Sequence, residues 1–195
     1  MNFIVTALIA PLFITGFQSA PNPKAVAMQK QAIQLLSDND KSNDDHALAL
    51  LNKAITLDPS YADLYSTRED LYIERKDYAS AMANLNKLIS LVPDRPEPVL
   101  EKGQLLEKLG KANEANDYYL DAVDKFQQLL LSMSSNDDEY ISVKLGYAVS
   151  LIMVNRNTDA RSIINDVLKR EPSSETAKRL KYASRPQIFD SIFGQ

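Results

Sequence analysis

A 34-residue internal repeat constrains the fold of this chain more than any other feature of its sequence. Ala47, Ala81 and Ala115 are separated by 34 residues twice, and the same spacing connects further positions. Positions that recur together at one spacing indicate structural units that stack, each burying its apolar face against its neighbour. The other positions in this register are Leu51, Leu85 and Tyr119, then Ala54, Leu88 and Ala122, and Pro59 with Pro93.

Each unit has the pattern of two helices. Between residues 62 and 93, apolar side chains recur at spacings of three and four in two runs, and the polar segment 74–77 separates the runs. This spacing places the apolar side chains of each run on one helical face. Pro93 ends the second helix because its nitrogen has no proton to donate. The sequence therefore predicts a helix hairpin, with Ala81 and Ala115 at positions where two helices approach closely.

The repeat resembles the tetratricopeptide repeat family, whose repeat length is 34 residues. In the second copy, Tyr65 and Tyr72 match the aromatic positions of the family, and in the third copy Gly103 and Gly110 match its small residue and its turn glycine. The resemblance implies an all-α fold, a right-handed solenoid of about four hairpins. We place the repeat domain at residues 21–184, with hairpins at approximately 25–60, 62–94, 96–134 and 139–173 and a capping helix at 174–184.

The first copy carries a polar insertion, residues 38–45, between its two helices. Acidic side chains alternate in it as they do in a calcium loop. However, Asn43 and Ala49 stand where that loop requires a glycine and a bidentate glutamate. We therefore predict no metal site, and we expect Asp44 or Asp45 to cap the helix that follows.

A second insertion separates copies three and four. Ala160 lies 45 residues after Ala115, so 11 extra residues have entered the 34-residue spacing. We expect them to lengthen the helix over residues 112–131 and to add a loop before Tyr140. Asn136 or Asp137 in this loop is expected to cap the next helix.

Residues 185–195 form a C-terminal apolar tail. Arg185 precedes a proline and is biased away from helix, so we expect the chain to turn there. Apolar side chains then recur at helical spacing, and leaving them in water would forgo about 1.5–3 kcal/mol each. We expect them either to fold back on the repeats or to dock into a partner or a second copy. The apolar residues are Ile188, Phe189, Ile192 and Phe193.

The amino end has the composition of an export signal. Residues 3–17 are apolar or small except for two threonines, and no Lys or Arg precedes Lys24. Fifteen such residues are too few to span a bilayer comfortably but match the apolar region of a secretory signal. We expect residues 1–20 to be a signal peptide of a periplasmic or secreted protein. The competing interpretations are an uncleaved membrane anchor and a buried first helix.

Composition excludes several functions. The 195 residues include 22 basic and 26 acidic side chains and no cysteine. An acidic balance argues against a general nucleic-acid binder, and the absence of Cys excludes disulfides, zinc thiolates and Cys nucleophiles. His46 is the only imidazole, and no motif brings a nucleophile to it. We therefore predict a protein that is not an enzyme and has no cofactor.

The resemblance implies a binding surface, because in the family the first helices of successive repeats line the concave side. Residues 38–139 carry 21 acidic and 11 basic side chains, whereas residues 140–195 carry 5 and 9. A groove lined this way runs from acidic to apolar and steers basic partners. The candidate contacts are Asp63, Ser66, Asp70, Glu74, Glu97, Leu100, Gln104, Glu107, Leu145, Val149 and Ile152, with Phe189, Ile192 and Phe193 as tail contacts.

These features predict a protein–protein interaction scaffold that binds a peptide or protein segment in its groove. The partner is expected to carry basic residues, and contact with a membrane would come only from residues 3–17 if they remain uncleaved. The alternative is a membrane-tethered factor for the assembly or stability of an envelope complex, which binds through its convex face and its termini.

Overall fold

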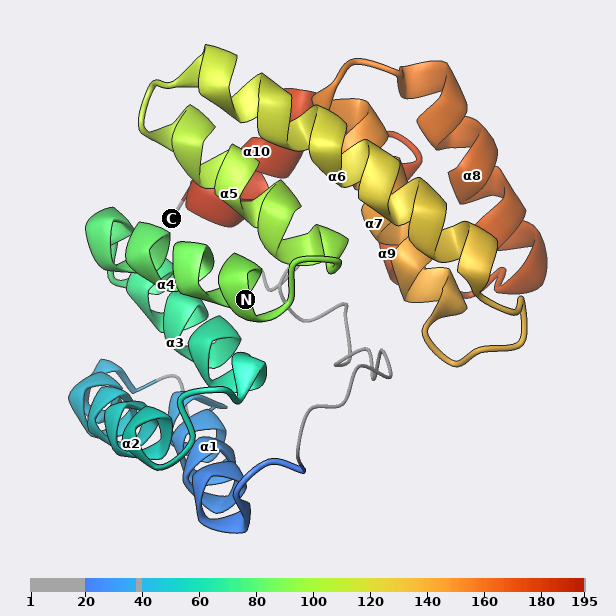
Figure 1. Cartoon of the computed structure of the whole chain (residues 1–195). Coiled ribbons are helices and arrows are strands. Elements are labelled where there is room, and N and C mark those ends of the chain that lie inside the picture. Colours follow the sequence, from blue (N-terminus) through green and yellow to red (C-terminus); the bar gives the residue numbers. More distant parts are fainter. Residues whose placement is uncertain (1–19, 38–39, 195) are drawn as a thin grey trace. The chain divides into compact units, whose positions relative to one another are not determined.

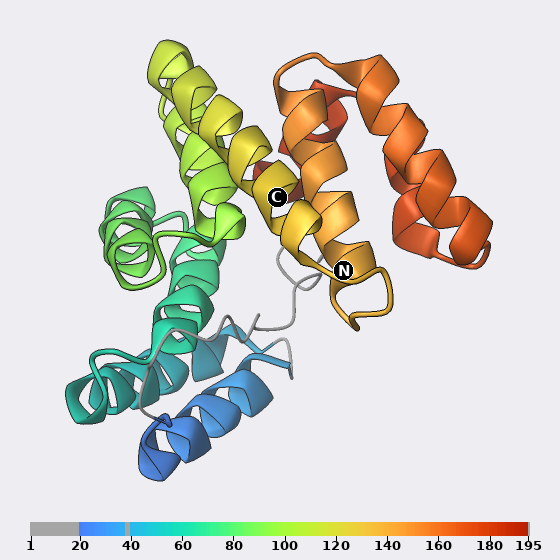
Figure 2. The ribbon, with the colours of Figure 1, turned by 45° about the vertical axis from the view of Figure 1, so that its right-hand side comes forward.

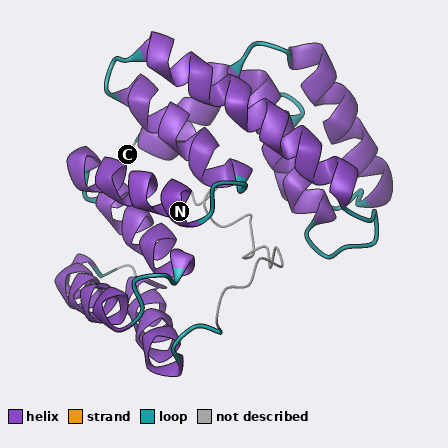
Figure 3. Cartoon of the chain, viewed as in Figure 1, coloured by secondary structure: helices purple, strands orange, loops and turns teal. Residues whose placement is uncertain are grey.

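All regular secondary structure in the described residues is helical, and loops connect the helices. A computed structural model describes residues 20–37 and 40–194, and in these ranges no strand occurs (Figure 3). The apolar stretch 3–17 and Asp38 of the polar insertion lie outside the described residues. The predicted fold class, all-α and built from helix hairpins, is confirmed.

The helices follow one another as antiparallel hairpins (Figure 1). A 3₁₀ turn, η2 (Lys41–Asn43), lies inside the first hairpin. The described residues divide into two compact units, 20–93 and 94–194. The first contains α1 (Pro23–Ser37), α2 (Asp44–Leu57), α3 (Ala62–Glu74) and α4 (Tyr78–Leu91). The second contains α5 (Pro96–Lys108), α6 (Ala112–Ser132), α7 (Tyr140–Met153), α8 (Asn157–Arg170), α9 (Glu175–Leu180) and α10 (Arg185–Phe193).

Alanines bring the helices of the amino-terminal unit close together. Ala25 and Ala32 of α1 and Ala47 and Ala54 of α2 are fully buried in one cluster. Small side chains permit short distances between helix axes, so the hairpin is held by dispersion contacts along its length. Larger apolar residues complete this cluster from both hairpins, namely Leu51, Leu64 and Leu71.

Arg68 links three helices of the amino-terminal unit. Its guanidinium, on α3, contacts both α2 and α4. Nη1 donates to Oδ1 of Asn52 on α2 at 2.6 Å, and Nη2 donates to Oδ1 of Asn84 on α4 at 2.7 Å. The guanidinium also lies over the rings of Tyr65 and Tyr72. Arg68 therefore connects α2, α3 and α4 through charge-assisted hydrogen bonds and contacts with aromatic rings.

The long helix α6 packs against both α5 and α7 in the carboxy-terminal unit, seen from a second angle in Figure 2. Tyr119 lies against Gly103 of α5, where an added Cβ would lie 2.7 Å from its ring, and Phe126 lies against Gly146 of α7, where the distance would be 2.6 Å. Both rings are fully buried. The extra length predicted for this helix, residues 112–131, agrees with α6 to one residue at its end.

In three hairpin turns, the second residue after the end of the first helix has a positive φ. These residues are Lys76 (φ 59°), Gly110 (φ 77°) and Asn155 (φ 62°). Lys76 and Gly110 are 34 residues apart, in the repeat register. Glycine adopts a positive φ without steric cost and asparagine at small cost, whereas lysine is destabilised by the full steric contact of its Cβ.

Two predicted helix caps are wrong. Asp44 and Asp45 are already helical, and Asn43, which precedes α2, makes no side-chain cap hydrogen bond. Asp40 instead caps η2 by accepting the N–H of Ser42 at 2.9 Å. Helix α7 has no side-chain cap hydrogen bond, and Asp137 instead accepts the N–H of Ser134 at 2.7 Å. Asp40 and Asp137 therefore stabilise the segments that precede the two helices, and neither caps the α-helix itself.

The turns lead to a reciprocal prediction. Lys76→Gly should raise the free energy of unfolding by about 1 kcal/mol, because glycine removes the steric penalty of positive φ. Gly110→Lys should lower it by a similar amount, since an added Cβ at Gly110 meets no atom within 4 Å and only the backbone conformation changes. Urea midpoints measure both effects. Lys87→Gly, in the exposed interior of α4, is the control and should destabilise.

Candidate partner-binding face

The first helix of the second hairpin, α3, carries four polar side chains on one face. Asp63, Ser66, Asp70 and Glu74 are spaced by three, four and four residues, which places them along one side of the helix. Leu64 and Leu71 lie in the core of the amino-terminal unit. We call the four residues the acidic face of α3. The first three are partly buried and Glu74, the last residue of the helix, is exposed.

A buried amide joins α1 to α3 beside this face. Gln29 Nε2 donates to the carbonyl oxygen of Asp63 at 3.0 Å and to Thr67 Oγ1 at 2.9 Å, and its Oε1 accepts the hydroxyl of Tyr61 at 2.8 Å. Burial, together with the nearby Asp63 carboxylate, raises the pKa of Tyr61 to about 12. Three hydrogen bonds of Gln29 therefore connect α1 to the start of α3, and the Tyr61 hydroxyl is protonated and donates at neutral pH.

Asp70 is the most perturbed acid of the acidic face. Its Oδ1 atom is buried and has no hydrogen-bond partner among the described residues. Burial, and to a smaller extent the negative charge of Glu74, raises the pKa of Asp70 to about 7. The carboxyl group is therefore close to half ionised at neutral pH. A cationic side chain placed beside it would favour the ionised form.

The predicted contacts on α5 differ in accessibility from those on α3. Glu97, Leu100 and Gln104 are all buried, with 4% of Glu97 exposed. Arg95 Nε lies 3.4 Å from Glu97 Oε2. Burial raises the pKa of Glu97, and Arg95 opposes this rise. The expectation that these three side chains line an open groove is therefore not met in this structure, because none of them is accessible.

Helix α10 packs against α7 and also contacts the end of α5. Arg185 donates to both carboxylate oxygens of Glu107, with Nε–Oε1 at 3.2 Å and Nη2–Oε2 at 2.9 Å. At the other end of α10, Phe193 is buried and its carbonyl oxygen accepts from Lys108 Nζ at 3.5 Å. The predicted contacts of α7 are buried as well, namely Leu145, Val149 and Ile152.

The other predicted tail residues lie on α10. Phe189 and Ile192 are partly buried, and the rings of Phe189 and Phe193 are tilted with centroids 4.9 Å apart. The turn predicted at Arg185 is wrong by one residue. Ser184 is extended and its N–H donates to Gln187 Oε1 at 2.8 Å, while Arg185 is already helical. The capping interaction overrides the bias of a residue that precedes proline.

Sequence reasoning missed two contributors to this arrangement. Arg185, which the sequence predicts as a turn residue, binds Glu107 from 78 positions away. Tyr119 lies in the repeat register and its ring is buried, but its hydroxyl also donates to Glu107 Oε2 at 2.6 Å. The sequence does show that Glu107 and Arg185 have opposite charges and that each lies at an end of its helix. Because 78 positions separate them, their pairing cannot be inferred from spacing along the chain.

The next features concern the lone histidine, metal binding and membrane spans. His46 is exposed in the first turn of α2. Across residues 20–37 and 40–194, no group of three or more acidic or His side chains is placed to hold a metal ion. In the same ranges, no helix has the length and apolar character needed to cross a membrane.

Comparisons with known proteins agree with the repeat architecture. No protein-family model matches the chain. The chain is 24% identical over 190 residues to tetratricopeptide repeat protein 28 of Mus musculus, a match that covers 95% of this chain but spans only 7% of that relative's length. The crystal structure of PilW, a widely conserved type IV pilus biogenesis factor, aligns with a TM-score of 0.62 and 17% identity over 87% of this chain and 74% of PilW. The tetratricopeptide protein YrrB, which has an unusual peptide-binding site, aligns over 80% of this chain and 74% of YrrB, with a TM-score of 0.48 and 22% identity.

The raised pKa of Asp70 predicts a stability that depends on pH. Between the ordinary aspartate pKa of 3.8 and about 7, the unfolded chain has lost the proton and the native chain keeps it. Native stability therefore falls as pH rises through this window, and the penalty is complete above it. Asp70→Asn removes the penalty and should gain on the order of 2–4 kcal/mol more stability at pH 8 than at pH 4.

Chemical unfolding across pH 4–8 measures this difference. Asp124→Asn changes an exposed aspartate on α6 in the same way and serves as the control. Its stability difference from the native chain should stay nearly constant over the range. An Asp70→Asn difference that is equally flat would show that the carboxyl group is hydrated in the native protein.

Proposed function

Because the chain is an array of tetratricopeptide-like repeats, as its 34-residue register predicts, we propose that it is a non-catalytic scaffold for protein–protein interaction. The scaffold holds a peptide or protein segment against the first helix of each hairpin, on the side that carries the acidic face in α3. The observation that carries the proposal is the acidic face of α3. Its residues lie on a different side of the helix from the core leucines, so hairpin packing does not account for their polarity.

The chemistry of this face favours a basic segment as the partner. Asp70 ionises only near neutral pH because its carboxyl group is poorly hydrated and lies close to the charge of Glu74. A Lys or Arg of a partner, placed between the two carboxylates, would lower the pKa of Asp70 and offset the repulsion. Binding would then release a proton. Affinity is therefore expected to rise between pH 6 and pH 8.

Site-specific photo-crosslinking tests the binding face in cells. A photoreactive amino acid at Ser66, on the acidic face of α3, should form adducts with a discrete protein. The same group at Lys87, exposed on α4, should not. Adduct yield from Ser66 should fall with Glu74→Lys and with added salt, because exposed charges are screened beyond about 8–10 Å at physiological ionic strength.

The control for charge reversal is Asp124→Lys, which changes net charge equally on exposed α6. It should leave the Ser66 adducts intact. Adducts that form only from Lys87 would reject the inner face as the binding surface. Ser66 adducts that are insensitive to Glu74→Lys, to salt and to pH would reject a basic partner while leaving the scaffold function in place.

We further propose that the scaffold acts after export, in the periplasm or outside the cell. The support is the composition of residues 3–17, which matches the apolar region of a secretory signal. The alternative function, a membrane-tethered factor for the assembly or stability of an envelope complex, rests on the same stretch if it remains uncleaved.

Cell fractionation with amino-terminal sequencing separates the two locations. Export predicts a protein in the soluble fraction whose mature chain starts near Pro21. Tethering predicts the uncleaved chain in the membrane fraction, released by detergent but not by high salt. An uncleaved chain in the cytosolic fraction would contradict both.

A further inference from the structure

Helix α10 is held at its first residue by a charged contact with α5. The Arg185 guanidinium and the Glu107 carboxylate form two parallel hydrogen bonds, and each side chain is 23% exposed. The guanidinium also lies 5.3 Å from the centre of the Tyr119 ring. Tyr119 donates its hydroxyl to Glu107, so the carboxylate is oriented before Arg185 reaches it. Paired hydrogen bonds of this kind combine strength with geometric selectivity.

The last residue of α10 is held by the neighbouring residue of α5. Lys108 Nζ lies 5.4 Å from the ring centre of Phe193 and 6.0 Å from that of Phe189, and it donates to the Phe193 carbonyl oxygen. Glu107 therefore meets the amino end of α10, and Lys108 meets its carboxyl end. This arrangement matches the helix dipole, which is positive at the amino end and negative at the carboxyl end.

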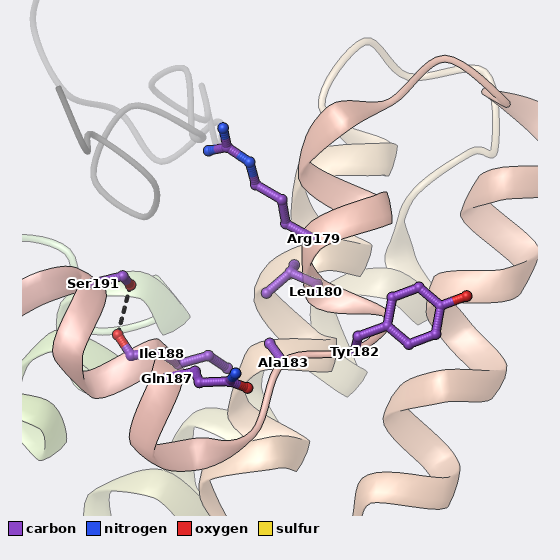
Figure 4. Close-up of a pocket in the computed structure, with 7 residues that line it drawn as sticks. All are labelled: Arg179, Leu180, Tyr182, Ala183, Gln187, Ile188 and Ser191. Carbon is purple, nitrogen blue, oxygen red and sulfur yellow. Dashed lines mark hydrogen bonds between the residues drawn. The ribbon is translucent and has the colours of Figure 1, made fainter.

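Helix α10 is not closely packed on every side. A cavity of about 260 Å³ separates part of it from α9 and the connecting segment (Figure 4). Tyr182 in that segment is 74% exposed. Nine residues are too few for a stable helix in isolation, so α10 depends on its contacts with α5 and α7. The cavity is lined by Arg179, Leu180, Tyr182, Ala183, Gln187, Ile188 and Ser191.

These contacts lie on α5 and α7, the first helices of their hairpins, on which the proposed function places the partner. Helix α9 already packs against α8, the second helix of the last hairpin. Helix α10 instead presents an arginine followed by apolar side chains to the first helices. The apolar residues follow Arg185 by three, four, seven and eight positions.

We propose that Glu107 and Lys108, together with the adjoining face of α7, bind a helical segment of a partner protein that begins with an arginine and carries apolar side chains at these positions. Helix α10 occupies this site when no partner is present. The inference rests on the proposed function and specifies the partner chemistry for the carboxy-terminal unit. Binding of the partner segment displaces α10 into solvent.

The test measures binding of a fluorescent synthetic peptide, residues 184–194 of this chain, to the full-length protein by anisotropy. The double variant Ile188→Ser/Phe193→Ser loses the two buried side chains of α10 and leaves Glu107 and Lys108 unchanged. This variant should bind the peptide at least about tenfold more tightly than the native chain does, because its own α10 no longer fills the site.

The charged contact is tested by a double-mutant cycle. A peptide with Arg185→Gln should bind the Ile188→Ser/Phe193→Ser variant, called here the loosened chain, about tenfold more weakly than the native peptide does. Adding Glu107→Gln to the loosened chain should remove this difference, so that both peptides bind alike. Equal binding of the two peptides while Glu107 is present would overturn the proposal.

A second variant guards against loss of folding. Arg185→Ala keeps every apolar side chain of α10 and should also increase peptide binding. Helical circular dichroism confirms that each variant is folded. Failure of both folded variants to bind the peptide overturns this inference alone if the Ser66 adducts persist, and it counts against the proposed function as well if they do not. A dimer in the native chain that Arg185→Ala abolishes would assign the site to a second copy and overturn a partner protein as the occupant.

Discussion

The close contact of two aromatic rings with two glycines organises the carboxy-terminal unit. Tyr119 and Phe126, seven residues apart on α6, lie against Gly103 of α5 and Gly146 of α7. A methyl group at either position would overlap the ring. Both neighbouring helices, α5 and α7, therefore carry a glycine where they meet α6. One helix can therefore serve two neighbours. Tyr119 also positions Glu107, because its hydroxyl donates to Glu107 Oε2 at 2.6 Å. Burial and this hydrogen bond raise the pKa of Tyr119.

The sequence was most informative where local rules and the repeat agree. Ala81, Ala115 and Leu85 are fully buried, as their shared register predicts. Gly110 has the positive φ expected of a turn glycine. These features depend on contacts within one hairpin or between adjacent hairpins. Spacing along the chain is therefore enough to reveal them.

The candidate site was less predictable because its properties arise from tertiary contacts. Polar residues at helical spacing occur on both α3 and α5, so spacing alone does not distinguish Glu74, which is exposed, from Glu97, which is buried. The near-neutral pKa of Asp70 likewise follows from burial. The caps expected from Asp44 and Asp137 failed because several polar residues in one loop compete for few backbone N–H groups.

The short connection between α9 and α10 sets how strongly any other molecule must bind to the same surface. Residues 181–184 join the two helices, so α10 cannot diffuse away from its site when it detaches. A tether of this length holds a ligand at an effective concentration on the order of millimolar. A free segment with the same intrinsic affinity would have to approach that concentration to occupy half of the molecules. The surface therefore favours ligands that are tethered to it. A partner that also binds at a second point on the chain gains the same high effective concentration as α10.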